Sequence, residues 1–143
     1  MSISQILNVM ASAMSVASVR MNVTASNLAN AGSVGGTEAE TYRAKHAIFS
    51  QVQGLVPGIP RNEQPLGGVR VLDIIKNKKP LEWRLDPNNP LADKDGKVYL
   101  SDVNPVEEMA DMISASRQYQ ASVEVMNTTK NLLMQTIRAI NNL

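Results

Sequence analysis

The residues that interrupt helices are confined to the middle of this chain. All eight glycines and all seven prolines lie between residues 32 and 105. Because glycine and proline are the strongest local breakers of regular structure, residues 1–31 and 106–143 can each form one uninterrupted helix. The sequence therefore predicts a mainly α protein with a small β insert. Two long terminal helices, over 1–31 and 106–143, flank a small β-rich domain over 32–105.

An apolar seam runs along the N-terminal segment in steps of three and four residues, which is typical of helices packed as coiled coils. Arg20 is the one charged residue among residues 1–31, and a helix that is neutral on every side is normally buried. A helix of about 29 residues is about 44 Å long, whereas a compact chain of 143 residues has a radius of gyration of about 14 Å. We therefore expect neighbouring subunits to cover this assembly interface, which comprises Leu7, Met10, Met14, Ala17, Met21 and Leu28.

The C-terminal segment opens with a strong signal for a helix start. Asn104 suits the N-cap, Pro105 the first helical position and Glu107 the third. Because the middle must return the chain, we expect the two helices to pair antiparallel as a coiled-coil-like hairpin. We expect both to be loosely ordered in the isolated chain and to become fixed when neighbours bury their other faces. The expected interface on this helix comprises Met109, Met112, Tyr119, Val123, Met126, Leu133, Ile137 and Ile140.

The middle of the chain is predicted to contain short strands. Residues 43–53 and 68–75 are rich in β-branched and apolar side chains, which favours strands. Asp95-Gly96 predicts a type I′ hairpin turn ahead of a further strand at 98–100. Glycines near the start of this region favour a flexible linker over 32–41.

Composition excludes several kinds of site. With no cysteine and one histidine, the chain cannot form disulfides, thiolate nucleophiles or multi-histidine metal clusters. A net charge of +1 argues against a nucleic-acid surface, which normally needs a basic face. No run of 18 apolar residues suggests a membrane span. The first Lys or Arg is Arg20, so we expect no cleaved secretory signal, which would need a positive N-terminal region.

The chemistry that remains gives no convincing catalytic site. His46 could serve as a base or a ligand, but it has no second candidate nearby in the sequence, so a surface or packing role is favoured. Asp93 and Asp95 hint at a calcium loop, yet the required oxygen ligand at the first position is a leucine, Leu91. We expect no enzyme activity, no metal and no cofactor. A small enzyme in the β region, with either His46 or the pair Asp93 and Asp95 at its site, is kept as an alternative.

Several motifs resemble one known family. Ser26, Asn27, Leu28, Ala29 and Asn30 spell SNLAN, the signature near the N-terminus of the bacterial flagellar axial proteins of the rod and hook. Residues 41–49, 89–93 and the run 104–127 (NPVEEMADMISASRQYQASVEVMN) resemble the proximal rod branch of that family. Where many axial proteins follow the SNLAN motif with a Thr-Pro-Gly-Tyr turn, residues 31–40 intervene here, as is usual in this branch.

The resemblance implies a structural subunit of the flagellar basal-body rod, in which the terminal helices form the inner tube and the middle forms an outer β domain. The partners that it implies are copies of the same chain, other rod proteins, the adapter on the MS-ring side, the distal rod and the flagellar type III export apparatus. The location that it implies is the periplasmic rod, reached without a cleaved signal peptide. Neither nucleic acid nor direct membrane insertion is expected.

Two further alternatives remain at this point. One is another type III-exported axial or needle-like subunit, which would share the helical ends but not the motifs of the middle. The other is a cytoplasmic coiled-coil adaptor that binds a single partner.

Overall fold

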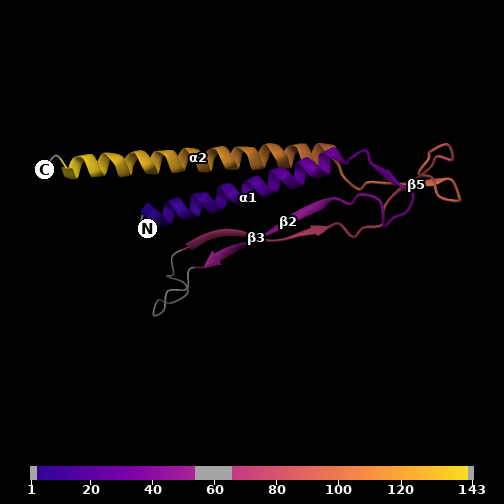
Figure 1. Ribbon diagram of the computed structural model, residues 1–143, viewed down its shortest axis with the longest axis horizontal. Helices are drawn as coiled ribbons and strands as arrows, with labels where there is room; N and C mark the ends of the chain where they lie inside the picture. Colours follow the sequence, from indigo (N-terminus) through magenta and orange to yellow (C-terminus); the bar gives the residue numbers. More distant parts are fainter. Residues whose placement is uncertain (1–2, 54–65, 142–143) are drawn as a thin grey trace. The chain divides into compact units, whose positions relative to one another are not determined.

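The computed structural model describes residues 3–53 and 66–141. Two long terminal helices pack together and small β-sheets lie between them in the sequence, which confirms the predicted fold class (Figure 1). The elements are α1 (Ile3–Ala29), β1 (Val34–Gly35), β2 (Lys45–Gln53), β3 (Leu66–Lys76), β4 (Trp83–Leu85), β5 (Lys97–Leu100) and α2 (Pro105–Asn141). Residues 1, 2, 142 and 143 of the predicted helices lie outside the described residues.

The chain divides into two compact units, and each unit contains parts of both helices. The first, the junction unit, comprises residues 20–48 and 73–113; the second, the helical unit, includes 3–19 and 114–141 among its described residues. The prediction of a separate helical domain and β domain is not tested by this division and stays a prediction.

The helices are antiparallel in the junction unit. Arg20 of α1 lies 3.8 Å from Asp111 of α2, and Asn27 of α1 bonds to Glu108 of α2. Residue numbers therefore increase along α1 in the direction in which they decrease along α2. The start of α2 also forms as predicted: Asn104 Oδ1 accepts from the backbone N–H of Val106 at 3.1 Å, and Pro105 occupies the first helical position. This confirms the N-cap.

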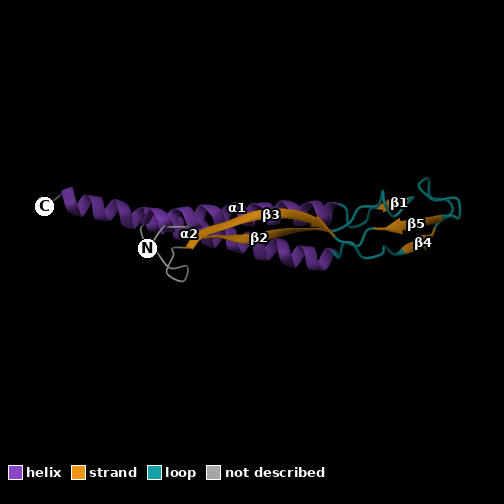
Figure 2. Ribbon diagram, turned by 90° about the horizontal axis from the view of Figure 1, so that it is seen from below, coloured by secondary structure: helices purple, strands orange, loops and turns teal. Residues whose placement is uncertain are grey.

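A three-stranded antiparallel sheet completes the junction unit, with the strand order β1-β5-β4 (Figure 2). Val34 pairs with Leu100, and Trp83 pairs with Tyr99. Val98 in the central strand is fully buried. The segment 32–41, which was predicted to be a flexible linker, therefore contains a paired strand; its mobility stays a prediction.

The turn before β5 differs from the predicted type I′ geometry. That turn needs a positive φ at both central residues, but among the described residues only glycines have one, with Gly96 at +75°. The Asp93 carboxylate instead accepts from the backbone N–H groups of Asp95 (2.9 Å) and Lys97 (2.8 Å). The prediction was wrong because an aspartate side chain can close a turn through its own hydrogen bonds, which leaves one left-handed position for Gly96.

The second sheet is the pair β2 and β3, and it agrees with the predicted strands to within two residues. In the helical unit, the start of β3 contacts α1. Gly68 has a φ of +103°, and the N–H of Val69 donates to Ser12 Oγ at 3.1 Å. A Cβ on Gly68 would overlap Ser12 Oγ. Glycine is thus required there for its backbone conformation and for the close approach to α1.

Among the described residues, α1 is the helix that is long and apolar enough to cross a membrane by length and composition. The core helix of a soluble protein can pass the same test. The expectation that the chain does not insert directly into a membrane stays a prediction.

Candidate assembly site

The predicted interface on α1 is mostly half-buried within the chain. Ala17 is fully buried. Its neighbours along the seam each keep part of their surface exposed: Leu7, Met10, Met14, Met21 and Leu28. Packing against this chain's own residues therefore leaves surface on α1 that a neighbour could still bury.

The inner face of α2 differs from the predicted interface. Its buried residues recur every seven positions and most have short side chains: Glu108, Ala115, Ser122 and Thr129. The predicted residues beside this line are half-buried: Met112, Tyr119, Val123, Met126 and Leu133. The remaining three are exposed, at 47% for Met109, 45% for Ile137 and 64% for Ile140. Whether these residues form the assembly interface stays a prediction.

The sequence analysis did not predict this buried line of Glu108, Ala115, Ser122 and Thr129, because the predicted interface was based on large apolar side chains. Short side chains at a seven-residue spacing also mark a packed helix face, since small residues let two backbones approach closely. The hydroxyls are satisfied within α2: Ser122 donates to the Gln118 carbonyl at 2.9 Å and Thr129 to the Val125 carbonyl at 2.8 Å. That spacing was the signal that could have found the line.

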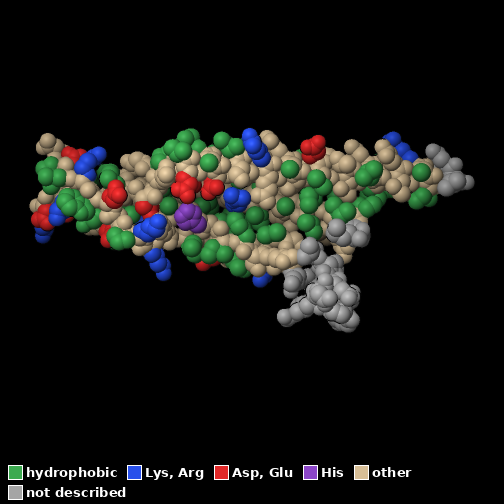
Figure 3. Space-filling model, turned by 180° about the vertical axis from the view of Figure 1, so that it is seen from behind, with side chains coloured by type: hydrophobic (Ala, Val, Ile, Leu, Met, Phe, Trp, Pro, Cys, Tyr) green, Lys and Arg blue, Asp and Glu red, His purple; other side chains and the backbone are tan. Residues whose placement is uncertain are grey.

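Hydrophobic surface remains along the helices. Figure 3 shows large uncharged areas with sparse charged side chains over them. In the helical unit, the exposed apolar residues of α2 include Val125, Leu132, Met134, Ile137 and Ile140. Exposed apolar side chains that gather on one part of a molecule are typical of interaction sites.

Asn27, in the SNLAN motif, lies at the centre of the polar contacts in the junction unit. Its side chain is fully buried. Nδ2 donates to the carbonyl of Lys45 and to Oε1 of Glu108, both at 2.8 Å. Oδ1 accepts from the Tyr42 hydroxyl at 3.0 Å and from the Lys45 N–H at 2.9 Å. All four hydrogen-bonding positions of the amide are therefore used. We call Asn27, Tyr42, Lys45 and Glu108 the Asn27 cluster.

The rest of the SNLAN motif ends α1. Ser26 Oγ lies 3.0 Å from the Tyr42 hydroxyl, and Asn30 Nδ2 donates to the Ser26 carbonyl at 2.8 Å. Asn30 thus satisfies a carbonyl that the end of a helix leaves without an intrahelical partner. Leu28 is half-buried, while Ala29 is exposed. The motif connects the end of α1 to the start of β2 and to the first turns of α2.

Glu108 is a carboxylate held in the buried part of this cluster, with 6% of its surface exposed. Burial raises the pKa of Glu108 above its ordinary value, and the bond from Asn27 and the charge of His46 lower it in part. Asp111 and Glu107 raise the pKa further through like-charge repulsion. The cluster therefore favours the neutral form of Glu108 more than water does.

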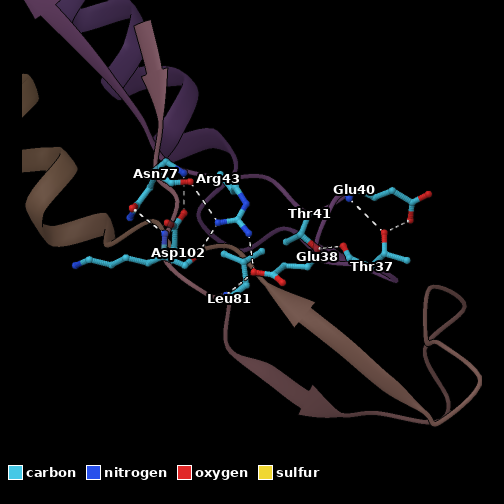
Figure 4. A network of polar contacts seen from close by, with 10 residues as sticks. Thr37, Glu38, Glu40, Thr41, Arg43, Asn77, Leu81 and Asp102 are labelled. Atoms are coloured by element: carbon cyan, nitrogen blue, oxygen red, sulfur yellow. Dashed lines mark hydrogen bonds and ion pairs between the residues drawn. The ribbon is translucent and has the colours of Figure 1, made fainter.

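A second polar network fixes the loops of the junction unit (Figure 4). The Arg43 guanidinium donates to the carbonyls of Asn77 (3.2 Å) and Lys79 (2.6 Å) and to the Glu38 carboxylate (2.6 Å). Glu38 also accepts from the Leu81 N–H at 3.1 Å. One arginine therefore joins the segment before β2 to the segment after β3.

The candidate catalytic residues belong to different elements: His46 lies in β2, and Asp93 and Asp95 lie in the turn before β5. His46 is exposed, and the Asp93 carboxylate is used in the turn with Asp95. Within residues 3–53 and 66–141, no group of three histidine, aspartate or glutamate side chains could hold a metal ion.

Two stretches of the chain match families of flagellar proteins. Residues 7–35 match the family described as flagella basal body rod protein, and residues 94–139 match the family described as flagellar basal body rod FlgEFG protein C-terminal. The matches cover most of α1 and of α2. Together with the paired terminal helices, they define a flagellar basal-body rod protein.

Relatives over nearly the whole chain identify the particular family. The chain is 47% identical to the flagellar basal-body rod protein FlgC of Yersinia enterocolitica, 43% identical to that of Salmonella typhimurium and 44% identical to that of Escherichia coli O157:H7. Each alignment covers 96% of this chain and 97% of the relative. The chain therefore belongs to the FlgC family of flagellar basal-body rod proteins, which are structural components of the motility apparatus and not enzymes.

Proposed function

We propose that this chain is a subunit of the proximal rod, that it polymerises helically through its terminal helices, and that the assembled helices transmit motor torque. The observation that carries the proposal is the apolar surface left on the end of α2. Leu132, Met134 and Ile140 are 56%, 46% and 64% exposed, and α2 has 37 residues against 27 in α1. Neighbouring helices are needed to cover this surface.

Helical polymerisation follows from how such surfaces repeat. A contact that joins two different patches, one on each copy, adds subunits without closing into a ring. Each helix then packs on several neighbours, so a torsional load is shared among many side-chain contacts. The half-buried state of the seam on α1 supports this arrangement, because it leaves surface available to more than one partner.

The partners proposed for this function are copies of the chain, other rod proteins, the adapter on the MS-ring side and the distal rod. We propose export through the flagellar type III apparatus without a cleaved signal peptide. One property supports this route: the sequence has no cysteine to form a disulfide before export. The periplasmic rod is the proposed destination.

The test uses a flagellated host whose own FlgC gene is deleted and replaced by this one. We expect motility to return, and we expect purified basal bodies to contain this chain with its N-terminus intact by mass spectrometry. Recovery of the chain in the cytoplasm, with no rod formed, would instead support the adaptor alternative. A shortened N-terminus would contradict export without cleavage.

A further inference from the structure

The end of β3 that belongs to the junction unit has a free edge. Among the described residues, β3 pairs with one strand, β2. Residues 73–76 lie in the junction unit and are all exposed, and the side chains of Ile74 and Ile75 are 45% and 44% exposed. An exposed strand edge with apolar side chains is a template for pairing with a strand of another chain. A free copy of the chain therefore carries an edge at which a second copy can pair.

Hydrogen bonds establish which backbone groups of β3 face this edge. Alternate residues of an antiparallel strand direct their N–H and C=O groups to opposite edges. The Asn77 N–H, directly after β3, donates to the carbonyl of Ala44 at 2.8 Å and so faces the strand β2. By this alternation, the N–H and C=O groups of Ile74 and Lys76 face the free edge.

An aspartate side chain binds one of the two outward N–H groups. Asp73 Oδ1 accepts from the Ile74 N–H at 2.8 Å, so this donor is not available to a carbonyl of an incoming strand. An incoming strand would also have to remove water from the carboxylate, which costs free energy. Charged residues on an edge strand protect it against pairing with other chains.

The opposite edge of the same sheet is closed in the same manner. Lys45 follows Ala44, so its backbone groups face away from β3 by the same alternation. Asn27 Oδ1 accepts from the Lys45 N–H at 2.9 Å, and Asn27 Nδ2 donates to the Lys45 carbonyl at 2.8 Å. At both edges, a side-chain oxygen therefore binds an N–H group that faces away from the neighbouring strand.

We propose that the Asp73 carboxylate closes the free edge of β3 against a second copy of this chain. Two copies of the edge can pair antiparallel about Ile75, with Ile74 of each copy opposite Lys76 of the other. This pairing uses the N–H and C=O groups of residues 74 and 76 in both copies, and the bond between Asp73 and the Ile74 N–H blocks it twice.

Such a pair of edges would be symmetric. A symmetric contact joins the same patch on both copies and closes on itself, so it does not extend into a helical assembly. Closing the edge keeps free copies from forming these dimers. The inference goes beyond the proposed function, because it concerns the free chain and stands whether or not the assembled helices transmit torque.

Disulfide formation tests the edge in the purified full-length chain, which contains no cysteine of its own. In the pairing about Ile75, the two copies of this residue form a non-hydrogen-bonded pair with their Cα atoms about 4.5 Å apart, which permits a disulfide. Under mild oxidation, we expect Ile75→Cys alone to stay mainly monomeric. Adding Asp73→Ala frees one donor in each copy and should raise the disulfide-linked dimer by at least about tenfold.

Two matched variants separate the possible causes. Asp73→Asn in the Ile75→Cys chain keeps a side-chain oxygen for the Ile74 N–H, so it should keep the dimer fraction low. The second variant combines Asp73→Ala with Ile74→Cys. Its thiol lies opposite Lys76 of the other copy, so it should form no more dimer than Ile74→Cys alone.

Hydrogen exchange of the Asp73→Ala chain without a cysteine gives an independent measurement. The amides of Ile74 and Lys76 should become protected as the concentration rises. The proposal is overturned if they stay unprotected, or if Asp73→Ala leaves the dimer fraction of Ile75→Cys unchanged. An equal rise with Asp73→Asn, or with the thiol at position 74, would also overturn it, because association would then depend neither on the bond to the Ile74 N–H nor on this strand pairing.

Discussion

Asn27 Nδ2 lies 2.8 Å from Oε1 of Glu108, although the two residues are 81 positions apart in the chain. This bond connects the end of α1 to the first turns of α2. Since both side chains are buried, neither can replace its partner with water. One amide of the SNLAN motif therefore contributes a buried polar contact to the antiparallel pairing of the helices.

Replacing Asn27 by leucine should destabilise the chain strongly. Leucine has a similar volume but leaves Glu108, the Tyr42 hydroxyl and both backbone groups of Lys45 without this partner. Buried polar groups without hydrogen bonds cost free energy, so we expect the free energy of unfolding to fall by about 3 kcal/mol. Urea unfolding followed by circular dichroism measures it.

Asn22→Leu is the matched control, because Asn22 lies on the same helix and is exposed. Exposed substitutions usually change stability by less than about 0.5 kcal/mol. Equal losses for Asn22→Leu and Asn27→Leu would show that the cluster does not contribute as described.

Glu108→Gln should change how stability depends on pH. Burial raises the pKa of Glu108 in the folded chain, so the folded state favours the neutral carboxyl. The stabilisation is fully present below the ordinary pKa of 4.5 and is lost as the pH rises through the raised value. Glutamine stays neutral, so the variant should gain stability relative to the original chain as the pH rises from 4.5 toward neutral.

The measurement is the difference in unfolding free energy between the two chains at several pH values. Glu124→Gln is the control, since Glu124 is exposed on the same helix and is not among the groups that shift the pKa of Glu108. A difference for Glu108→Gln that is constant across this range would contradict the effect of burial.

Gly68→Ala should weaken the attachment of β3 to α1. A methyl group there would overlap Ser12 Oγ, and the φ of +103° is strained for alanine. We expect a loss of about 2 kcal/mol in unfolding free energy. Gly32→Ala is the control, because a Cβ at Gly32 meets nothing within 4 Å. Ser12→Ala removes the overlap but also the hydrogen bond from the Val69 N–H, so the effect of Gly68→Ala is measured again in the Ser12→Ala chain. A smaller loss there assigns part of the effect to the overlap, and an equal loss assigns it to backbone strain alone.

Local patterns were sufficient for the two helices and for β2, β3 and β5, but not for the short strands β1 and β4 or for the long-range contacts. The start of α2 at Asn104 and Pro105 could be predicted because an N-cap depends on adjacent residues. The SNLAN motif pointed to Asn27 only through resemblance, since its partners at Lys45 and Glu108 lie 18 and 81 positions away. Sequence spacing carries no information on which distant backbone groups an amide will reach.

For the candidate interface, too, the sequence did not identify which residues make contact within the chain. A seam of large apolar residues predicted one face of α2, yet the buried line uses Ala115, Ser122 and Thr129. Helical periodicity states which residues share a face but not which of two faces packs inside the chain. The exposed Ile137 and Ile140 fit the prediction only if neighbouring subunits cover them.

Hydrogen exchange should divide the dilute chain according to these contacts. The helix segments 3–19 and 114–141 keep much of their surface exposed. Under the proposed function this surface is covered only in the assembled rod, so the amides of these segments should exchange fast in the dilute chain. Residues 97–100 pair on both sides within the sheet, so they should exchange more slowly. Uniform strong protection from residue 3 to residue 141 would contradict ordering on assembly.

Met126→Asp should block incorporation into the rod. Met126 is half-buried beside the inner line of α2, and a charge there must be desolvated both in the helix pair and against any neighbour. Asn131→Asp adds the same charge at an exposed position of the same helix and should leave motility near normal. We expect cells with Met126→Asp not to swim. The variant chain should be present in the cell at its normal level but absent from purified basal bodies. Equal motility of the two variants would remove Met126 from the assembly interface, because the added charge would then be tolerated at either position.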